Sequence, residues 1–251
     1  MNYNWHWRIL FEAEPGGTGS YLHYLIVGLG WTLATALAAW VIALTLGAIV
    51  GTLRTTSRRW VVRLGNLYVE IFRNVPLIVQ MFLWFFVVPE LLPQALGDRI
   101  KQMPPPWGSY LPAVMCLAIF TSVRVAEQVR AGINSLPRGQ RMAGTAMGLT
   151  EFQSYRYVIL PQSFRIILPP LTSEFMNIIK NSSVALTIGL LELTGRARAM
   201  QEFSFRVFEA FTAATVIYLI TNLLVVLAMR ALEKKVRVPG LIAASASAGG
   251  H

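Results

Sequence analysis

The first apolar segment of the chain covers residues 25–53, 29 positions without a formal charge that are followed by Arg54. A helix of this length spans about 43 Å, more than the roughly 30 Å hydrocarbon core of a bilayer. Only 14% of all residues are charged and 55% are hydrophobic, whereas a soluble domain carries about 25% charge. These values exclude an ordinary water-soluble globule and a disordered chain, and they predict an all-α integral membrane protein.

Four more stretches are apolar enough to be expected as membrane helices, at about 64–92, 110–131, 163–180 and 207–230. Backbone amides must find hydrogen bonds inside lipid, so each stretch is predicted to be helical. Five spans place the two termini on opposite sides. With the C-terminus in the cytoplasm, fifteen Lys and Arg residues lie inside and seven outside, as the positive-inside rule favours.

The stretch 181–206 fits this topology poorly, because its arginines lie on the outer side. We expect either that part of it re-enters the membrane or that it contains a further span. We predict residues 1–24 as an N-terminal periplasmic segment, 25–240 as the transmembrane domain and 241–251 as a disordered tail. The first 24 residues lack a basic start and a small-residue cleavage pattern, so we do not expect a cleavable signal peptide there.

Gly47 and Gly51 lie four residues apart on one face of the first span. This spacing allows a neighbouring helix to approach closely. The alternative is that the two glycines reflect only the general frequency of glycine in membrane helices.

Residues 132–162 form a hydrophilic insert between the third and fourth spans. Ser135 is predicted to cap a helix over 137–147, and Gly148 to end it in the left-handed conformation. Thr150 and Gln153 predict a capping box for a second helix, which Leu160-Pro161 is expected to end.

Two short helices about a glycine also resemble a DNA-reading helix-turn-helix, and the net charge of +10 would suit that reading. The insert is tethered at both ends to membrane spans, which leaves little reach to a duplex groove. A docking platform for a cytoplasmic partner fits better, and we expect no nucleic-acid partner.

The insert resembles the EAA loop of ABC-importer permeases. The residues that carry the resemblance keep the family spacing and are Met142, Ala143, Gly144, Gly148, Leu160 and Pro161. Met142 stands where the family pattern has Glu, so a usual acidic contact with the ATPase is absent. The segments Tyr68–Gln80, Ala126–Gln140 and Pro169–Ser183 resemble polar amino-acid permeases of the histidine/glutamine/glutamate type, most closely glutamate/aspartate permease subunits.

The resemblance implies a type I ABC-importer permease-like bundle of about five transmembrane helices with a cytoplasmic coupling helix at about 135–162. It implies a multi-pass protein of the bacterial inner membrane, with its N-terminus periplasmic and its C-terminus cytoplasmic. The implied partners are ATPase subunits, a second permease subunit in a hetero- or homodimer, a periplasmic solute-binding protein, membrane lipid and an amino-acid substrate. The substrate would be glutamate or aspartate.

The chain itself contains no G-x-x-x-x-G-K-[ST] phosphate loop, so ATP hydrolysis is expected on another polypeptide and not here. The single cysteine, Cys116, excludes a cysteine-based metal site. We expect no metal and no cofactor.

Charged residues within the spans need a reason, because each costs about 2.5–3.5 kcal/mol at the bilayer centre. Arg124 lies in the inner half of the third span, and Arg can hold a carboxylate by two parallel hydrogen bonds. We therefore predict that Arg124 recognises the substrate carboxylate. The alternatives are an internal ion pair with Glu127 or Glu174, or extension of the side chain to the cytoplasmic surface.

Glu174, Asn177 and Lys180 recur every three residues and form one polar stripe on the fourth span. We predict that this stripe faces the substrate path, with a partner surface as the alternative. Glu127 and Arg130 are three residues apart and are predicted to pair along one helix face.

Three other functions remain as alternatives. The first is an ABC-importer permease for another polar amino acid. The second is a self-sufficient secondary transporter, which the lack of inverted repeats disfavours. The third is an intramembrane enzyme, which is disfavoured because no H-E-x-x-H or G-x-S-x-G motif occurs.

Overall fold

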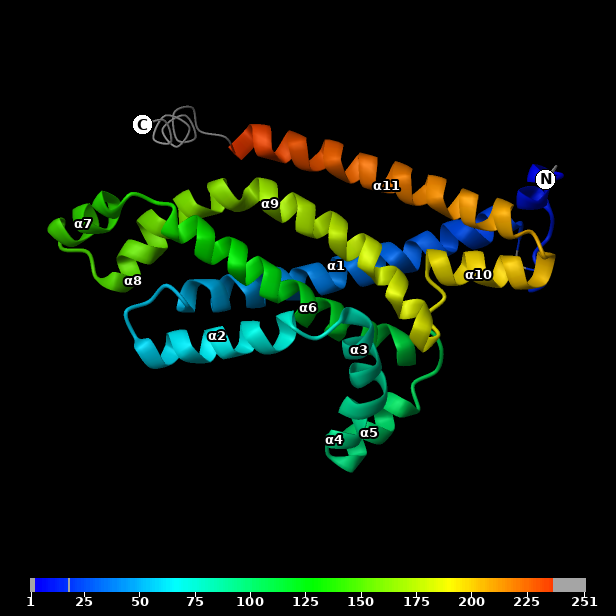
Figure 1. The fold of residues 1–251 in the computed structure, drawn as a ribbon, viewed down its shortest axis with the longest axis horizontal. Helices are drawn as coiled ribbons and strands as arrows, with labels where there is room; N and C mark the ends of the chain where they lie inside the picture. The colour runs from blue at the N-terminus through cyan, green and yellow to red at the C-terminus, as the bar shows by residue number, and fades with distance from the viewer. Residues whose placement is uncertain (1–2, 18, 237–251) are drawn as a thin grey trace.

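A computed structural model of the chain describes residues 3–17 and 19–236, so the predicted tail at 241–251 lies outside the described residues. Four long helices run lengthwise side by side (Figure 1). They are α1 (Tyr21–Leu53), α6 (Trp107–Asn134), α9 (Leu160–Asn181) and α11 (Val207–Val236). The N-terminus lies at one end of the long axis, and the short helices of the insert lie at the other (Figure 1).

Among the described residues, α1, α6 and α11 are long and apolar enough to cross a membrane. They confirm the spans predicted at 25–53, 110–131 and 207–230. The span predicted at 163–180 falls within α9, whose 22 residues reach about 33 Å. That helix is too polar to qualify by composition, so the surrounding helices and not its hydropathy account for its position.

The span predicted at 64–92 is wrong as a single helix. It consists of α2 (Arg59–Arg73) and a second helical arm, and the two are bent by 99°. The arm contains α3 (Leu77–Phe82), the π-helical turn η2 (Leu83–Val87) and α4 (Val88–Leu91).

The side chain of Gln80 holds this bend. Its Nε2 donates to the carbonyl oxygens of Phe72 at 2.9 Å and Val75 at 3.0 Å, which the break leaves without helical partners. Pro76 stands at the N-cap of α3 and lacks the amide that would continue α2.

The stretch 181–206 contains a 3₁₀ segment, η4 (Ser182–Ile188), and the helix α10 (Leu193–Ser204). Twelve residues of helix span about 18 Å, too short to cross the membrane. The expectation of a further full span there is therefore wrong. Two further short elements are η1 (Trp7–Phe11) at the N-terminus and α5 (Gln94–Lys101), which follows α4.

The insert folds into α7 (Arg138–Ala146), α8 (Glu151–Ser154) and the π-helical turn η3 (Tyr155–Ile159), which we call the coupling unit. Gly148 has φ of +75°, which confirms the left-handed end of the first helix. The capping box between Thr150 and Gln153 is present as predicted.

Two predictions about the insert are wrong. Ser135 does not cap α7; it ends α6 and donates from Oγ to the Gly132 carbonyl at 2.9 Å. Leu160-Pro161 does not end a helix but begins α9, which continues directly from η3. Proline is tolerated there because it occupies the first turn after a π-helical turn, in which Leu160 N–H already reaches back to the Tyr155 carbonyl.

The core of the bundle is the contact between α1 and α6. A Cβ added at Gly47 would lie 2.5 Å from Val125 Cβ, and one at Gly51 would lie 2.7 Å from the Ala126 carbonyl oxygen. These distances confirm the prediction of close helix packing at the two glycines.

Candidate functional site

Two charged side chains face each other between α6 and α9. Arg124 projects from α6 and Glu174 from α9, with 3.7 Å between Nη1 and Oε2. The two helices pack closely because Gly132 of α6 leaves room for Ile167 of α9. The structure therefore supports the internal pair that the sequence left open for Arg124.

The pair is loose. A separation of 3.7 Å gives Coulombic attraction but not a hydrogen bond. The Arg124 side chain keeps 43% of its surface exposed, and its guanidinium carbon lies 4.9 Å above the centre of the Phe120 ring. A guanidinium stacked on one ring and weakly held on one side still offers N–H donors in a planar fork.

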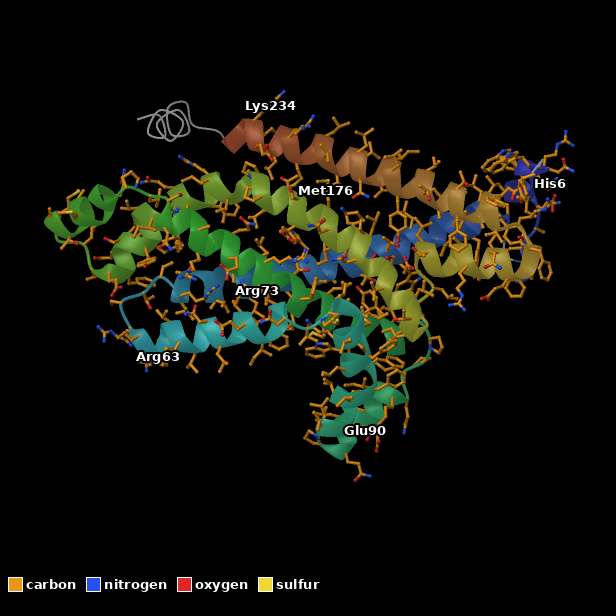
Figure 2. All side chains as sticks on the ribbon, viewed as in Figure 1. His6, Arg63, Arg73, Glu90, Met176 and Lys234 are labelled. Atoms are coloured by element: carbon orange, nitrogen blue, oxygen red, sulfur yellow. The ribbon has the colours of Figure 1, made fainter. Side chains whose placement is uncertain are left out.

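Glu174 is the more buried member, at 13% exposure. Its Oε2 is buried and accepts no hydrogen bond from any described residue. Buried carboxylate oxygens almost always have donors, so this oxygen marks a position where a donor from a ligand would be stabilised. Met176, two residues further along α9, lies about midway along the long axis of the molecule (Figure 2).

Asn177 is half-buried and Lys180 is exposed, and both lie on later turns of α9. The structure shows no contact of either with the Arg124 guanidinium. Of the four predicted substrate residues, it therefore brings together Arg124 and Glu174 and leaves Asn177 and Lys180 further along the same helix.

The sequence predicted an ion pair between Glu127 and Arg130, and this prediction is wrong. Glu127 pairs with Arg54, with 2.9 Å between Oε1 and Nη1. Arg54 is 6% exposed, and its Nε donates to Asn66 Oδ1 at 2.8 Å. The sequence interpretation placed Arg54 only among cytoplasmic charges. The Arg54 side chain packs against Gly65, where an added Cβ would lie 2.6 Å from Arg54 Cγ. A glycine at position 65 was the sequence feature that could have indicated this close approach.

The coupling unit is joined to the membrane helices through the turn between α1 and α2. Tyr155 donates its hydroxyl to the Thr55 carbonyl at 2.8 Å, and its oxygen lies 3.1 Å from Thr55 Oγ1. Ser57 Oγ lies 3.3 Å from a carboxylate oxygen of Glu151. Thr55 directly follows Arg54, so this turn contacts both the coupling unit and the Arg54–Glu127 pair.

The predicted coupling residues occupy three different environments. Met142 is 70% exposed on α7, beside Ala143, which is also exposed. Gly144 faces α8, where a Cβ would lie 2.5 Å from Ser154 Oγ. Leu160 and Pro161 lie in the first turn of α9 and not in a loop. The coupling unit also exposes three large apolar side chains that are not part of the EAA motif. They are Met147, Phe152 and Tyr157, at 80%, 77% and 69% exposure.

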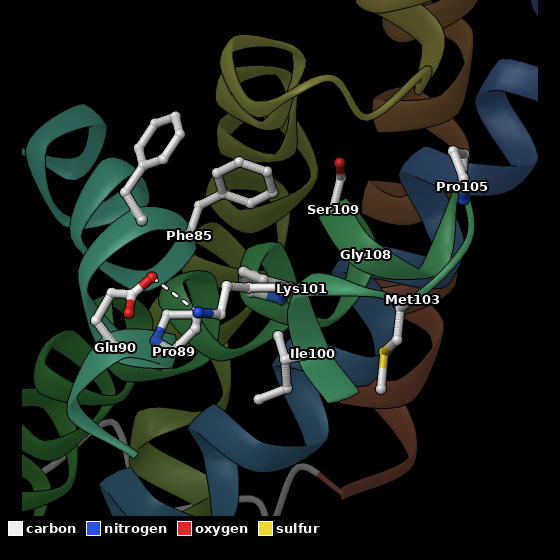
Figure 3. Close-up of a pocket in the computed structure, with 11 residues that line it drawn as sticks. Phe85, Pro89, Glu90, Ile100, Lys101, Met103, Pro105, Gly108 and Ser109 are labelled. Carbon is white, nitrogen blue, oxygen red and sulfur yellow. Dashed lines mark hydrogen bonds and ion pairs between the residues drawn. The ribbon is translucent and has the colours of Figure 1, made fainter. Parts of the chain in front are cut away.

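A cavity of about 330 Å³ lies away from all predicted site residues, between the helical arm, α5 and the start of α6 (Figure 3). Its walls are mainly apolar and include Phe85 and Met103. The Lys101 Nζ lies 2.9 Å from Glu90 Oε1, and this hydrogen bond raises the pKa of Lys101. Each charge at this cavity is satisfied by the other, unlike Glu174. Within the described part of the chain, no group of three or more His, Cys, Asp or Glu side chains could hold a metal ion.

Comparison with known proteins gives consistent similarities. Residues 43–238 match the family model of binding-protein-dependent transport system inner membrane components. The glutamate/aspartate import permease protein GltJ of Escherichia coli (strain K12) is 47% identical over 241 residues, which cover 96% of this chain and 98% of GltJ. The glutamine transport system permease protein GlnP of the same strain is 31% identical over 233 residues, covering 92% and 98%.

Solved structures show the same fold. An amino acid ABC transporter crystallised with histidines matches with a TM-score of 0.72 at 30% identity, covering 86% of this chain and 95% of that one. The inward-facing MetNI methionine ABC transporter matches with a TM-score of 0.72 at 20% identity, covering 86% and 98%, which supports the fold alone.

Proposed function

This chain belongs to the binding-protein-dependent transport system inner membrane components, as a permease subunit of an amino-acid ABC importer, and we propose that it carries glutamate or aspartate. The observation that carries the proposal is the loose pair of Arg124 and Glu174, with the buried Oε2 that accepts no hydrogen bond from the described residues. The 47% identity to GltJ supports the same substrate class.

In the proposed mode, the substrate carboxylate binds the Arg124 guanidinium through two parallel N–H···O bonds. Such a bidentate contact is stronger than the single 3.7 Å attraction to Glu174 that it replaces. The substrate ammonium group then donates to Glu174 Oε2. Asn177 and Lys180 extend this polar path along α9 toward the end of the bundle where the N-terminus lies.

A second feature supports a transport subunit that depends on a separate ATPase subunit. The coupling unit exposes Met142, Met147, Phe152 and Tyr157 at 69–80% of their surface, a degree of apolar exposure that marks a protein contact. We assign this surface to a separate ATPase subunit. Gly148 ends α7 in the left-handed conformation, and Gly144 leaves room for Ser154 of α8, so the two halves of the unit pack closely.

The proposed assembly contains a second permease subunit, as a hetero- or homodimer, and a periplasmic solute-binding protein. The chain would cross the inner membrane with residues 1–24 in the periplasm and the C-terminus in the cytoplasm, and 25–240 would form the permease domain. The coupling unit, at the end of the bundle opposite the N-terminus (Figure 1), would then meet the ATPase on the cytoplasmic side.

The test is uptake by the complete complex in proteoliposomes with ATP inside and binding protein outside. Arg124→Ala should abolish glutamate and aspartate uptake, while basal ATP hydrolysis by the complex is retained. Arg124→Lys should recover only part of the uptake, because an ammonium group cannot form the bidentate contact. Unchanged uptake by Arg124→Ala would refute the assignment.

The alternative is that the substrate is another polar amino acid. The 31% identity to the glutamine permease GlnP supports this alternative. Competition of labelled glutamate uptake by excess aspartate, glutamine and histidine separates the two. Aspartate alone should compete if Arg124 reads a side-chain carboxylate. The chain without its partners should transport nothing, whereas a self-sufficient secondary transporter would follow an ion gradient.

A further inference from the structure

An exposed aromatic cluster lies at the N-terminal end of the bundle, formed by the segment 3–11 and the turn between α10 and α11. We call it the aromatic corner, and its members are Tyr3, Trp5, Trp7, Phe203, Phe205 and Phe208. The Trp5 and Trp7 rings stack with centroids 5.2 Å apart, and Phe208 lies 4.5 Å from the Tyr3 ring. Trp5 is 52% exposed, Phe203 62% and Phe205 84%.

The corner is a built structure and not a loose end of the chain. Tyr3 donates its hydroxyl to Glu209 Oε2 at 2.5 Å, and the His6 backbone amide donates to Oε1 at 2.7 Å. Glu209 is fully buried beneath the segment. Arg206 Nη1 donates to the Asn4 carbonyl at 3.3 Å, so the rings are held facing outward from a fixed backbone.

Phe205 gives an independent indication that the exposed rings have a role. Its φ of +57° is in the left-handed region, at the C-cap of α10, where Gly or Asn is strongly preferred. The residue therefore accepts an unfavourable backbone conformation while its ring gains almost no contact within the protein. Such a choice is explained when the ring is stabilised by something outside the chain.

The length of α11 places the corner at a definite depth. Its 30 residues span about 45 Å, and the charged residues Arg230, Lys234 and Lys235 put its C-terminal turns outside the roughly 30 Å hydrocarbon core. About 30 Å of helix counted back from Arg230 reaches Ala210, so the first turn of α11 lies in the headgroup layer. The exposed apolar residues Leu219, Leu223 and Leu227 face outward at 53–68% exposure along α11, and the aromatic corner continues this surface beyond its N-terminal end.

The arginines that fitted the topology poorly are also accounted for at this end. Arg196 lies 4.2 Å above the Tyr24 ring, and Arg198 pairs with Glu202 at 2.9 Å. Of these three arginines, Arg206 is the one next to an exposed ring of the corner, that of Phe205. An arginine among amphipathic Trp and Tyr rings is the composition of a membrane–water interface.

We propose that the aromatic corner is an interfacial anchor, which inserts its rings among the phospholipid headgroups on the N-terminal side of the membrane while Arg206 contacts lipid phosphate. The depth of α11 and the continuity with its outward apolar surface favour lipid over a soluble protein as the occupant. The anchor fixes the ends of α1 and α11 relative to the bilayer and is independent of which amino acid is carried.

The test measures the depth of a nitroxide attached at Phe205→Cys in the assembled complex in lipid vesicles, with Cys116→Ala and cysteine-free partner subunits. Cys116 is fully buried, so its replacement leaves the surface unchanged. Leu219→Cys serves as the deep control, and Lys235→Cys, at the exposed C-terminal end of α11, as the aqueous control. The label at 205 should collide with dissolved oxygen more than the label at 235, and with a water-soluble nickel chelate more than the label at 219.

A label at 205 that is as water-accessible as the one at 235 overturns the proposal. Immobilisation of that label by added binding protein, but not by lipid, also overturns it and makes the corner a protein-docking surface. A second measurement avoids changing Phe205. The fluorescence of Trp5 and Trp7 is the difference between the parent complex and the Trp5→Phe/Trp7→Phe variant. This difference signal should be quenched about twofold more by lipids brominated near the headgroup than by lipids brominated near the bilayer centre.

Discussion

Arg54, which ends α1, and Glu127, one turn from Arg124 on α6, form an ion pair with 2.9 Å between Nη1 and Oε1. The Arg54 side chain is 4% exposed and that of Glu127 is 37% exposed. The pair thus ties the first helix to the helix that carries the proposed substrate arginine. It lies next to the turn that contacts the coupling unit through Thr55 and Tyr155.

Glu127→Ala should destabilise the protein by about 2–3 kcal/mol, because it leaves the buried Arg54 charge uncompensated. The figure is below that for a fully buried pair, since Glu127 retains solvent contact. Thermal unfolding of the purified complex measures the change. Glu202→Ala is the matched control, since it removes the partner of exposed Arg198 and should cost at most about 0.5 kcal/mol. Equal losses in the two variants would contradict the structural role of the Arg54–Glu127 pair.

Gly47→Ala should destabilise the protein by about 1–3 kcal/mol, because the new Cβ would meet Val125 at 2.5 Å in the contact between α1 and α6. Gly30→Ala, in the same helix, is the control. No atom lies within 4 Å of its new Cβ, and alanine favours the helix, so stability should stay constant or rise by up to about 1 kcal/mol. Gly47→Ala should therefore lower the unfolding midpoint, whereas Gly30→Ala should leave it unchanged or raise it.

Phe152→Ser should weaken copurification of the ATPase subunit without lowering the stability of the permease. The Phe152 side chain is 77% exposed on the coupling unit, so its loss removes little internal packing. Leu91→Ser, equally exposed on the helical arm, is the control and should leave ATPase binding intact. Normal ATPase recovery with Phe152→Ser would exclude this side chain from the docking surface.

Glu192→Ala should cost about 2–4 kcal/mol, since the carboxylate is fully buried and accepts from the backbone amides of Thr194 and Gly195 and from the Thr32 and Tyr218 hydroxyls. The substitution leaves those donors unsatisfied where α1, α10 and α11 meet. Thermal unfolding measures the loss. Tyr218→Phe, which removes one donor only, should cost less than Glu192→Ala; the reverse order would contradict this account.

Local sequence features predicted several parts of the coupling unit and of the site. The left-handed glycine at 148 and the Thr150–Gln153 capping box were predictable because each depends on residues within one turn. Arg124 and Glu174 stood out because charges are rare in apolar spans. Their mutual orientation was left open, since it depends on how α6 and α9 are rotated against each other.

The sequence by itself determined the membrane class, three of the helical spans and the position of the coupling unit, because hydropathy and backbone preference act over neighbouring residues. Only the tertiary structure decided the 99° bend after Arg73, the continuation of the helix through Pro161, and the pairing of Glu127 with Arg54. Each of these rests on contacts that the order of residues does not specify. The Gln80 side chain of α3 reaches back to the last turn of α2 across the break between the two helices. Arg54 and Glu127 are 73 residues apart in the sequence, and they meet because helix packing brings distant segments together.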